Sequence, residues 1–345
     1  MKSAVQCAPG DIPLEEREAP RIVEPTDAIL RLSATCICGS DLWDYRGINS
    51  VVEPKPVGHE YRGIVEQVGG AVHSITPAQF VIGSFFASDN TCPNCKAGYL
   101  TSCLHRQFVG GAQATHLRVP LADGTLVATP EVPPGDLIPG LLALSDVMGT
   151  GWFAAVAANA QPGSTVAVVG DGAVGLLGVL APRQMGAERI IAMSRNESRQ
   201  KLASEFGATD IVTERGDEGV ARVKELTNGI GATRCWSVSG PRSRCKKRVV
   251  QRAPAARWVS SACRTGSRSA ASGCFTPTSV CMVDPRQYAV SSPSWSSWCA
   301  KERSTRAGSS TWCYPSTRWR RATARWTSAA RSRHCCALKA SRRHP

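Results

Sequence analysis

The sequence predicts an α/β protein made of two domains and a basic tail. Residues 1–150 consist of short strands broken by Gly and Pro, which favours a compact β-barrel-type domain with irregular loops. Over residues 151–232, short apolar strands alternate with helical stretches, a pattern typical of a doubly wound parallel sheet. A sharp change of composition after Ala232 marks the start of the tail, residues 233–345.

Short runs of residues predict the individual elements. In the first domain, the apolar run at 63–68 predicts a strand between glycine-containing turns. In the second domain, the apolar runs at 165–169, 189–193 and 210–212 predict three strands. The stretch 198–206 has the amphipathic spacing of a helix between the second and third of these strands. The order strand, helix, strand predicts parallel pairing.

The composition of the tail excludes an ordinary globular domain. Of the 41 Lys and Arg residues of the chain, 23 lie after Ala232, against two acidic residues, Asp284 and Glu302. The tail also holds seven of the nine Trp and nine of the 15 Cys, but only one Leu and no Ile. Such a segment cannot bury enough aliphatic surface to offset the loss of chain entropy. We therefore expect residues 233–345 to have no fold of their own and to leave the edge of the parallel sheet uncovered.

The genetic code suggests where this composition comes from. If one G is inserted after the codon of Ala232, the next residues can be read as D-A-V-L-E-C-V-G, a strand that ends in glycine. Every Trp codon then becomes a codon for Leu, Val or Met, which restores the missing aliphatic residues. The sequence therefore predicts that the tail is the gene of residues 1–232 continued in a shifted frame. The alternative is a genuine disordered basic tail that binds nucleic acid through Arg and Trp.

The absence of export and membrane signals in the sequence predicts the cellular compartment. No run reaches the 18 or so apolar residues of a membrane span. The chain starts Met1-Lys2-Ser3 and continues without the pattern of a signal peptide, so we expect a cytoplasmic protein with no membrane partner. In that setting the cysteines favour metal ligation over disulfides.

Two glycine-flanked motifs predict a catalytic zinc site. They are Cys38-Gly39-Ser40-Asp41 and Gly58-His59-Glu60, and they supply a soft thiolate and an imidazole. A catalytic zinc needs three protein ligands and one open position. The third ligand has to come from a distant loop, where Asp146 is the best candidate. Each residue alone is more often structural, so the prediction depends on their combination with the next motif.

The next motif is the glycine-rich run Gly170-x-Gly172-x-x-Gly175, which follows a predicted strand and opens a predicted helix with Ala173 and Val174. This context is typical of dinucleotide binding, with the pyrophosphate at the helix N-terminus.

The end of the second predicted strand favours NADP over NAD. An NAD site needs an acidic residue there to bind the ribose hydroxyls. This chain instead has Ser194 and Arg195, with Arg199 one turn further along. A serine does not repel a 2′-phosphate, and guanidinium groups bind it. The alternative is that both arginines are merely solvated.

These motifs, in this order, resemble the zinc-containing medium-chain dehydrogenase/reductase family over residues 1–232. The resemblance implies a GroES-like catalytic domain at 1–150 and the first half of a Rossmann domain at 151–232, with the active site between them. It implies that Asp41 orients His59, that Glu60 is an occasional zinc ligand, and that Ser40 begins a proton relay. Two departures are Trp43 where many members have a relay His, and Asp146 where many have a third zinc Cys.

The resemblance also implies a second, structural zinc in a lobe that normally has four cysteines. Here only Cys92, Cys95 and Cys103 are present, and the place expected for another, two residues after Cys95, holds Ala97. Three thiolates leave a tetrahedral site one ligand short, and His105 is the predicted substitute. The alternative is a vestigial loop of reduced cysteines without metal.

The resemblance thus implies a zinc-dependent alcohol dehydrogenase that acts on a small alcohol, aldehyde or ketone with NAD(P), forming homo-oligomers when intact. Because the second half of the cofactor-binding fold is replaced by the tail, we expect the chain as written to be inactive. The alternative from another class is a non-catalytic zinc-binding fragment with a disordered basic tail.

Overall fold

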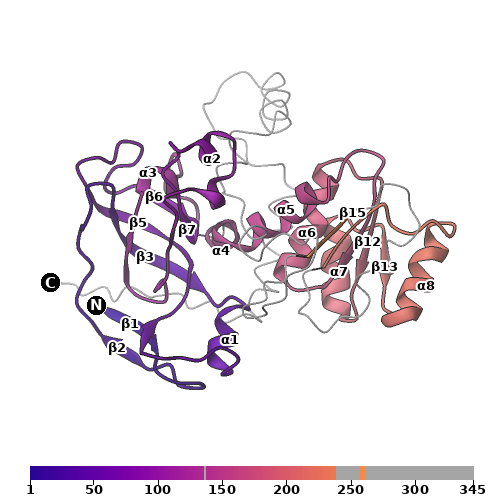
Figure 1. The fold of residues 1–345 in the computed structure, drawn as a ribbon, viewed down its shortest axis with the longest axis horizontal. Helices are drawn as coiled ribbons and strands as arrows, with labels where there is room; N and C mark the ends of the chain where they lie inside the picture. Colours follow the sequence, from indigo (N-terminus) through magenta and orange to yellow (C-terminus); the bar gives the residue numbers. More distant parts are fainter. Residues whose placement is uncertain (136, 238–256, 261–345) are drawn as a thin grey trace. The chain divides into compact units, whose positions relative to one another are not determined.

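The structure is a computed structural model that describes residues 1–135 and 137–237, with the backbone of 257–260 (Figure 1). It divides into two compact units between Asp146 and Val147, slightly before the boundary predicted at residue 150. The N-terminal unit here means the described residues up to Asp146, and the parallel-sheet unit means the described residues from Val147 onward. Our predictions for 238–256 and 261–345 lie outside the described residues.

The N-terminal unit is built on a five-stranded antiparallel sheet with the strand order β10-β6-β5-β3-β9. Strand β5 extends the predicted strand at 63–68 toward the N-terminus. The bounds of the sheet strands are β3 Ala28–Cys36, β5 Glu60–Val68, β6 Phe80–Gly83, β9 His116–Val119 and β10 Leu126–Ala128.

Smaller elements surround this sheet. A second sheet has the order β2-β1-β4, and a two-stranded sheet pairs β7 with β8. Their bounds are β1 Lys2–Gln6, β2 Leu14–Glu16, β4 Lys55–Pro56, β7 Phe86–Ala87 and β8 Gln107–Phe108. The helical segments of this unit are short: α1 Asp41–Tyr45, α2 Pro93–Lys96, η1 Leu100–Ser102, α3 Ala122–Thr125, α4 Ile138–Leu142 and η2 Ala143–Ser145.

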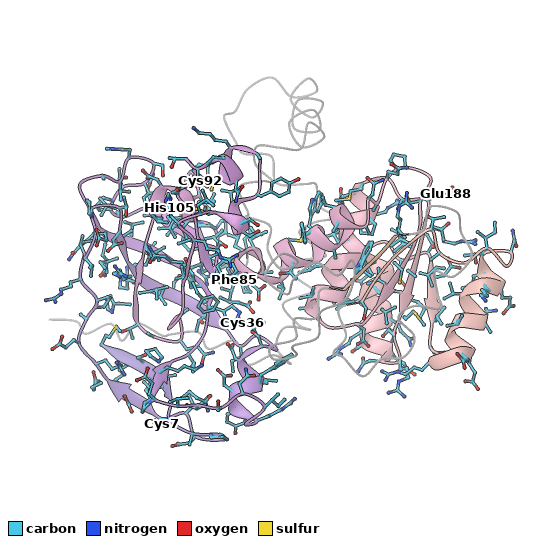
Figure 2. The ribbon with its side chains drawn as sticks, in the orientation of Figure 1. Cys7, Cys36, Phe85, Cys92, His105 and Glu188 are labelled. Carbon is cyan, nitrogen blue, oxygen red and sulfur yellow. The ribbon has the colours of Figure 1, made fainter. Side chains whose placement is uncertain are left out.

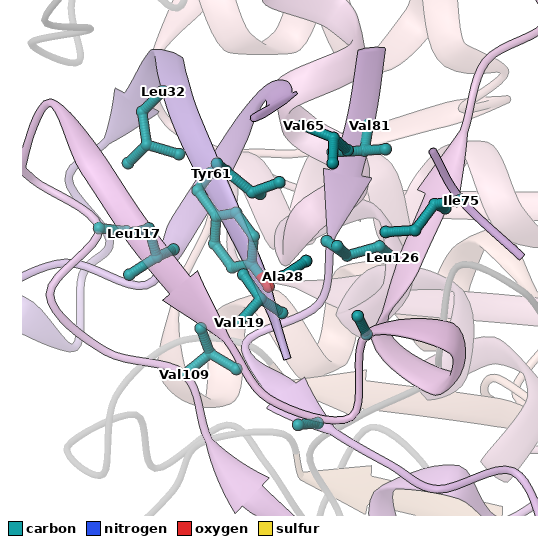
Figure 3. Close-up of a cluster of buried hydrophobic side chains, with 14 residues drawn as sticks. Ala28, Leu32, Tyr61, Val65, Ile75, Val81, Val109, Leu117, Val119 and Leu126 are labelled. Atoms are coloured by element: carbon teal, nitrogen blue, oxygen red, sulfur yellow. The ribbon is translucent and has the colours of Figure 1, made fainter. Parts of the chain in front are cut away.

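The side chains of β5 alternate between the core of the unit and a second face that carries candidate site residues. Tyr61 is fully buried in the main apolar cluster of the unit, where Val65 also packs (Figure 3). Its hydroxyl donates a hydrogen bond to the backbone carbonyl of Ser84 at 2.9 Å. Because successive side chains of a strand point to opposite faces, Glu60 is directed away from this cluster. It lies on the face where Ile64 packs against a separate cluster.

The parallel-sheet unit confirms the predicted alternation of strands and helices. Strands β11, β12 and β13 coincide with the three predicted strands and pair in parallel. Helix α7 starts where the side chain of Asn196 accepts a hydrogen bond from the backbone N–H of Arg199, and it ends at Gly207 with a positive φ of 112°. The bounds are α5 Val147–Ala157, β11 Thr165–Val169, α6 Ala173–Gln184, β12 Arg189–Met193, α7 Glu197–Phe206, β13 Asp210–Val212 and α8 Gly216–Leu226.

The sheet continues past Ala232, which corrects the prediction that it ends there with an uncovered edge. Strand β14, Arg234–Ser237, pairs in parallel with β11, and β15, Arg257–Ser260, pairs in parallel with β14. The strand order is β13-β12-β11-β14-β15. The physical reason is local: Cys235 and Trp236 are fully buried and supply apolar side chains at this edge even though the tail as a whole lacks aliphatic residues.

No single helix in the described part of the chain is long and apolar enough to cross a membrane. One broken pair of segments, Ile138–Ser145 with Val147–Ala157, passes that test by length and composition only.

Candidate functional site

Strand pairing brings the two predicted zinc motifs together. Strands β3 and β5 are antiparallel neighbours, and Cys36 at the end of β3 is paired with Glu60 at the start of β5. Cys38 follows the end of β3 and His59 precedes the start of β5, so the register places them at the same edge of the sheet. Asp146 arrives there at the end of η2, far away in the sequence.

These residues form a tight and mostly buried donor set, which we call the Cys38 cluster: Cys38, His59, Glu60 and Asp146. One ligand atom from each lies within 4.8 Å of all the others. The Cys38 Sγ is 3.2 Å from the Asp146 Oδ2, and the His59 Nε2 is 3.4 Å from the same oxygen. The exposed fractions of His59, Glu60 and Asp146 are 7%, 1% and 8%. The structure thus brings together all three predicted ligands and adds the Glu60 carboxylate.

Asp41 lies directly behind this cluster. Its Oδ1 is 3.3 Å from the His59 Nδ1, the ring nitrogen that faces away from Asp146. Its Oδ2 accepts a hydrogen bond from the backbone N–H of Cys38 at 2.8 Å. The Asp41 carboxylate therefore contacts both the ring of His59 and the backbone of Cys38. A carboxylate on the second ring nitrogen is a common way to orient a metal-binding histidine. Ser40, at the N-terminus of α1, is exposed and makes no side-chain capping hydrogen bond.

The charges of the cluster suit a cation. Burial raises the pKa of the Cys38 thiol, and the negative charge of Asp146 raises it further. For His59, burial opposes the charged ring, but hydrogen bonds to Asp146 and Asp41 outweigh it and raise the pKa. The protonated ring is a cation that offsets the neighbouring carboxylates, and the protonated thiol adds no further negative charge. A bound metal ion would take over that role, and the donors would release their protons to solvent.

Aromatic side chains stand beside the cluster, and the sequence reasoning missed them. The rings of Phe85 and Phe108 lie 5.4 and 5.9 Å from the His59 ring, centre to centre. Phe86 lies within 6 Å of both of these rings. Figure 2 shows Phe85 in the N-terminal unit. Phe108 is 60% exposed, so part of its ring surface is open to solvent beside the cluster.

The predicted structural-zinc residues form a second cluster, but with a different fourth member. Ligand atoms of Cys92, Cys95 and Cys103 lie together with a carboxylate oxygen of Asp89, all within 4.8 Å of one another. His105, the predicted fourth ligand, is not a member of this group. The side chain of His105 is 70% exposed, and its ring contacts Asp89 from outside (Figure 2 shows His105 and Cys92). The fourth donor of this group therefore lies before Cys92 in the sequence, and not after Cys95.

Hydrogen bonds in this lobe favour an anionic sulfur at Cys92, whereas burial raises the pKa of the Cys95 and Cys103 thiols. The Cys103 Sγ accepts hydrogen bonds from the backbone N–H groups of Asp89 and His105, at 3.5 and 3.3 Å. Hydrogen bonds from the backbone of Leu104 and Cys95 lower the pKa of the Cys92 thiol to about 7, more than desolvation raises it. A thiolate is the form of cysteine that binds metal.

The glycine-rich run lies at the carboxyl end of β11, as a dinucleotide site requires. Gly170 has a φ of +118°, in the region that favours glycine, and turns the chain out of the strand. Gly172 is the N-cap of α6, and a Cβ built on it would meet nothing within 4 Å, so this face of the loop is open. Ala173, Val174 and Gly175 form the first turn of α6, where backbone N–H groups lack partners within the helix.

The residues predicted to contact a 2′-phosphate meet near that loop. Ser194, which follows β12, donates its hydroxyl to the Asp171 Oδ2 at 2.8 Å. The Arg199 guanidinium on α7 lies 3.2 Å from the Asp171 Oδ1. Arg195 is exposed between them in the sequence. The structure therefore places Ser194 and Arg199 around one carboxylate that the sequence reasoning had not assigned a role.

Two family models match separate parts of the chain. The model described as the alcohol dehydrogenase GroES-like domain matches residues 24–131. The model described as zinc-binding dehydrogenase matches residues 173–278, past Ala232. The two matches correspond to the N-terminal unit and the parallel-sheet unit in that order.

Among curated relatives, zinc-type alcohol dehydrogenase B of Aspergillus flavus is 35% identical, over 70% of this chain. The chain spans only 58% of the length of that relative. A medium-chain reductase/dehydrogenase of an Acremonium species is 34% identical, over 70% of this chain and 86% of its own length.

Solved structures show the same architecture. The alcohol dehydrogenase from Thermus sp. ATN1 superposes with a TM-score of 0.69 at 28% identity, covering 78% of this chain and 79% of that one. A zinc-binding dehydrogenase from Sinorhizobium meliloti bound to NADP superposes with a TM-score of 0.63 at 25% identity, covering 75% of each chain. With these matches beside the donor set and the glycine-rich loop, the chain belongs to the zinc-dependent medium-chain dehydrogenase/reductase family.

Proposed function

We propose that the intact protein is a zinc-dependent alcohol dehydrogenase that interconverts a small alcohol and its aldehyde or ketone with a nicotinamide cofactor. The observation that carries the proposal is the buried Cys38 cluster. Its thiol, imidazole and carboxylates are donors that zinc prefers, and three of them leave the open position of a catalytic site. Zinc bound there would supply Lewis-acid polarisation of the substrate oxygen.

Each residue of the site has a role in this proposal. Cys38, His59 and Asp146 hold the metal, and Glu60 offers a further carboxylate from the same edge of the sheet. Asp41 positions His59 by its contact with the Nδ1. The exposed hydroxyl of Ser40 is available to pass a substrate proton to water.

The aromatic side chains next to His59 support a substrate with an apolar group. Phe85 and Phe108 provide apolar surface within 6 Å of the imidazole ring. An apolar substituent placed against them would be removed from water. We propose a small alcohol or carbonyl compound of this kind and no nucleic-acid partner.

We propose NADP(H) as the preferred cofactor. Ser194 stands where an NAD site needs an acidic residue, and Arg195 and Arg199 supply positive charge nearby. The neighbouring structure from S. meliloti is described as bound to NADP. We expect kcat/KM to be higher with NADP than with NAD, and Arg199→Ala to reduce that preference by about tenfold. An enzyme that prefers NAD would contradict this assignment.

We also propose that the second cluster holds a structural zinc through Cys92, Cys95, Cys103 and Asp89. In the full chain, Asp89→Ala should release zinc from this lobe to a chelator, whereas Asp89→Cys should keep it, because only the first change removes a donor. His105→Ala should retain the metal, since its ring lies outside the donor set. Metal analysis of the three variants checks this. Equal zinc content in wild type and Asp89→Ala would favour the metal-free loop.

Finally, we propose that residues 233–345 are encoded in a shifted frame and that the chain as written is inactive. The support is the composition of the tail and the concordant reading obtained by inserting one base after codon 232. The repaired chain, meaning the product with that one G inserted, is the right protein for activity measurements. Zinc content and alcohol-dependent reduction of NADP test the proposed function directly. A repaired chain that binds zinc but reduces no cofactor with any alcohol would favour a non-catalytic zinc-binding protein.

A further inference from the structure

The glycine-rich loop of the parallel-sheet unit carries an acidic residue that the proposed function does not use. Asp171 lies between Gly170 and Gly172, at the carboxyl end of β11. Ser194 follows the carboxyl end of the neighbouring strand β12. Because parallel strands present their carboxyl ends at the same edge, both residues lie where the adenosine part of a dinucleotide binds.

Asp171 occupies the two groups that would bind a 2′-phosphate. Its Oδ2 accepts the hydroxyl hydrogen of Ser194 at 2.8 Å, and its Oδ1 lies 3.2 Å from the Arg199 Nη1. Ser194 is only 5% exposed, so its hydroxyl is largely shielded from water. The Asp171 side chain is 27% exposed and remains accessible from solvent. The carboxylate is therefore an internal anion that contacts the same serine and arginine that are proposed to bind the phosphate.

The same carboxylate resembles the group that the second strand lacks. An NAD site uses an acidic side chain to accept hydrogen bonds from the ribose hydroxyls. Ser194 offers no carboxylate at the end of β12, but Asp171 places one within hydrogen-bond distance of that serine from the neighbouring loop. A ribose 2′-hydroxyl could donate to it, whereas a 2′-phosphate would be repelled by it and would compete with it for Arg199.

We infer that Asp171 is a specificity-determining residue that weakens discrimination in favour of the 2′-phosphate and allows the unphosphorylated ribose to bind. This inference rests on the proposed use of a nicotinamide dinucleotide and refines it. Ser194 and Arg199 favour the phosphate, and Asp171 opposes them. The preference between NADP and NAD is the balance of the two effects.

Binding of two adenosine fragments to the repaired chain, which serves as wild type and as the background of every variant here, tests the inference. The ligands are 2′,5′-ADP, which carries the 2′-phosphate, and 5′-AMP, which does not. Isothermal titration calorimetry should show that Asp171→Asn increases the ratio of 2′,5′-ADP affinity to 5′-AMP affinity by about tenfold. The substitution removes the negative charge but keeps the size of the side chain. Asp171→Ser should shift the ratio in the same direction.

A matched control separates this local effect from a general change of charge. Asp210 is another aspartate of the same unit paired with an arginine, its Oδ2 lying 3.4 Å from the Arg189 Nε. Both residues begin their strands, so the pair lies at the opposite edge of the sheet. Asp210→Asn should leave the affinity ratio unchanged. Arg199→Ala should lower the ratio, and adding Asp171→Asn to Arg199→Ala should raise it again, because the carboxylate that Arg199 no longer neutralises is then removed.

The outcomes distinguish the inference from the function on which it rests. If wild type binds both fragments and Asp171→Asn leaves their ratio unchanged, Asp171 has no role in specificity and the inference is wrong. An equal change of ratio in Asp210→Asn would also overturn it, since the effect would then be one of net charge. If neither fragment binds to wild type or to any variant, the proposed cofactor itself fails, and the inference fails with it.

Discussion

Replacing Cys38 with Ala should remove the metal from the Cys38 cluster and reduce kcat/KM of the repaired chain by more than about a thousandfold. The thiolate is one of three predicted ligands, and its loss leaves too few donors for stable binding. A metal Lewis acid contributes several kcal/mol to the reaction, which corresponds to this loss of rate. Zinc content and alcohol-dependent NADP reduction measure both effects. Circular dichroism should show the N-terminal unit still folded, because its main core does not include Cys38.

Cys36, two residues before Cys38 at the end of β3, provides a matched control. It is buried against Ala34 and Leu142, and it does not belong to the Cys38 cluster. Cys36→Ala should cost about 1 kcal/mol of stability through lost packing but should keep zinc and activity. Glu60→Gln should have a milder effect than Cys38→Ala if Glu60 is only an occasional ligand. Full activity of Cys38→Ala would show that this cluster is not the catalytic metal site and that the proposed reaction is wrong.

Local patterns predicted the elements well because they depend on neighbours in the sequence. The strands at 165–169, 189–193 and 210–212 are runs of apolar, largely β-branched residues, and β11, β12 and β13 coincide with them. The Cys38 and His59 motifs were recognisable from their glycine flanks, and strand register then brings them together. Asp146 was predicted from its place in a distant loop, and the structure puts its carboxylate 3.2 Å from Cys38.

Contacts between distant residues were harder to predict. Asp89 lies with Cys92, Cys95 and Cys103, but an aspartate ahead of a cysteine run resembles any polar loop residue. The pairing of Asp171 with Ser194 joins two loops that only the parallel sheet makes neighbours. Strand β14 was missed because the composition of the whole tail outweighed its short buried stretch. In each case the missing information was which segments the fold places side by side.

Inserting a single G after the codon of Ala232 should convert an inactive chain into an active dehydrogenase, the largest change that we expect. The cofactor binds across the two halves of a doubly wound sheet, and the family fold needs both. After Ala232 the chain as written has one Leu and no Ile with which to build the core of the second half. We expect no measurable alcohol-dependent NADP reduction before repair, and a rate at least about a thousandfold above background after it.

Strand β14 contains a buried polar atom that no described residue satisfies. Within the described part of the chain, the Nε1 of Trp236 has no hydrogen-bond partner, which costs about 1–3 kcal/mol. A Cβ built on Gly178 of α6 would lie 2.8 Å from this nitrogen, so the indole fills all the available space. The single-base insertion places a leucine at position 236, which removes the unsatisfied N–H and leaves an apolar side chain between β14 and α6.

Expression of both versions side by side decides the question, with solubility, protease resistance and NADP reduction as the measurements. Trp236→Leu in the unrepaired chain is the matched control, because it removes the buried indole N–H and leaves the rest of the tail as written. It should not restore activity, since the core of the second half is still missing. If the unrepaired chain is as soluble, protease-resistant and active as the repaired one, residues 233–345 are a genuine part of the enzyme. The frameshift hypothesis is then wrong.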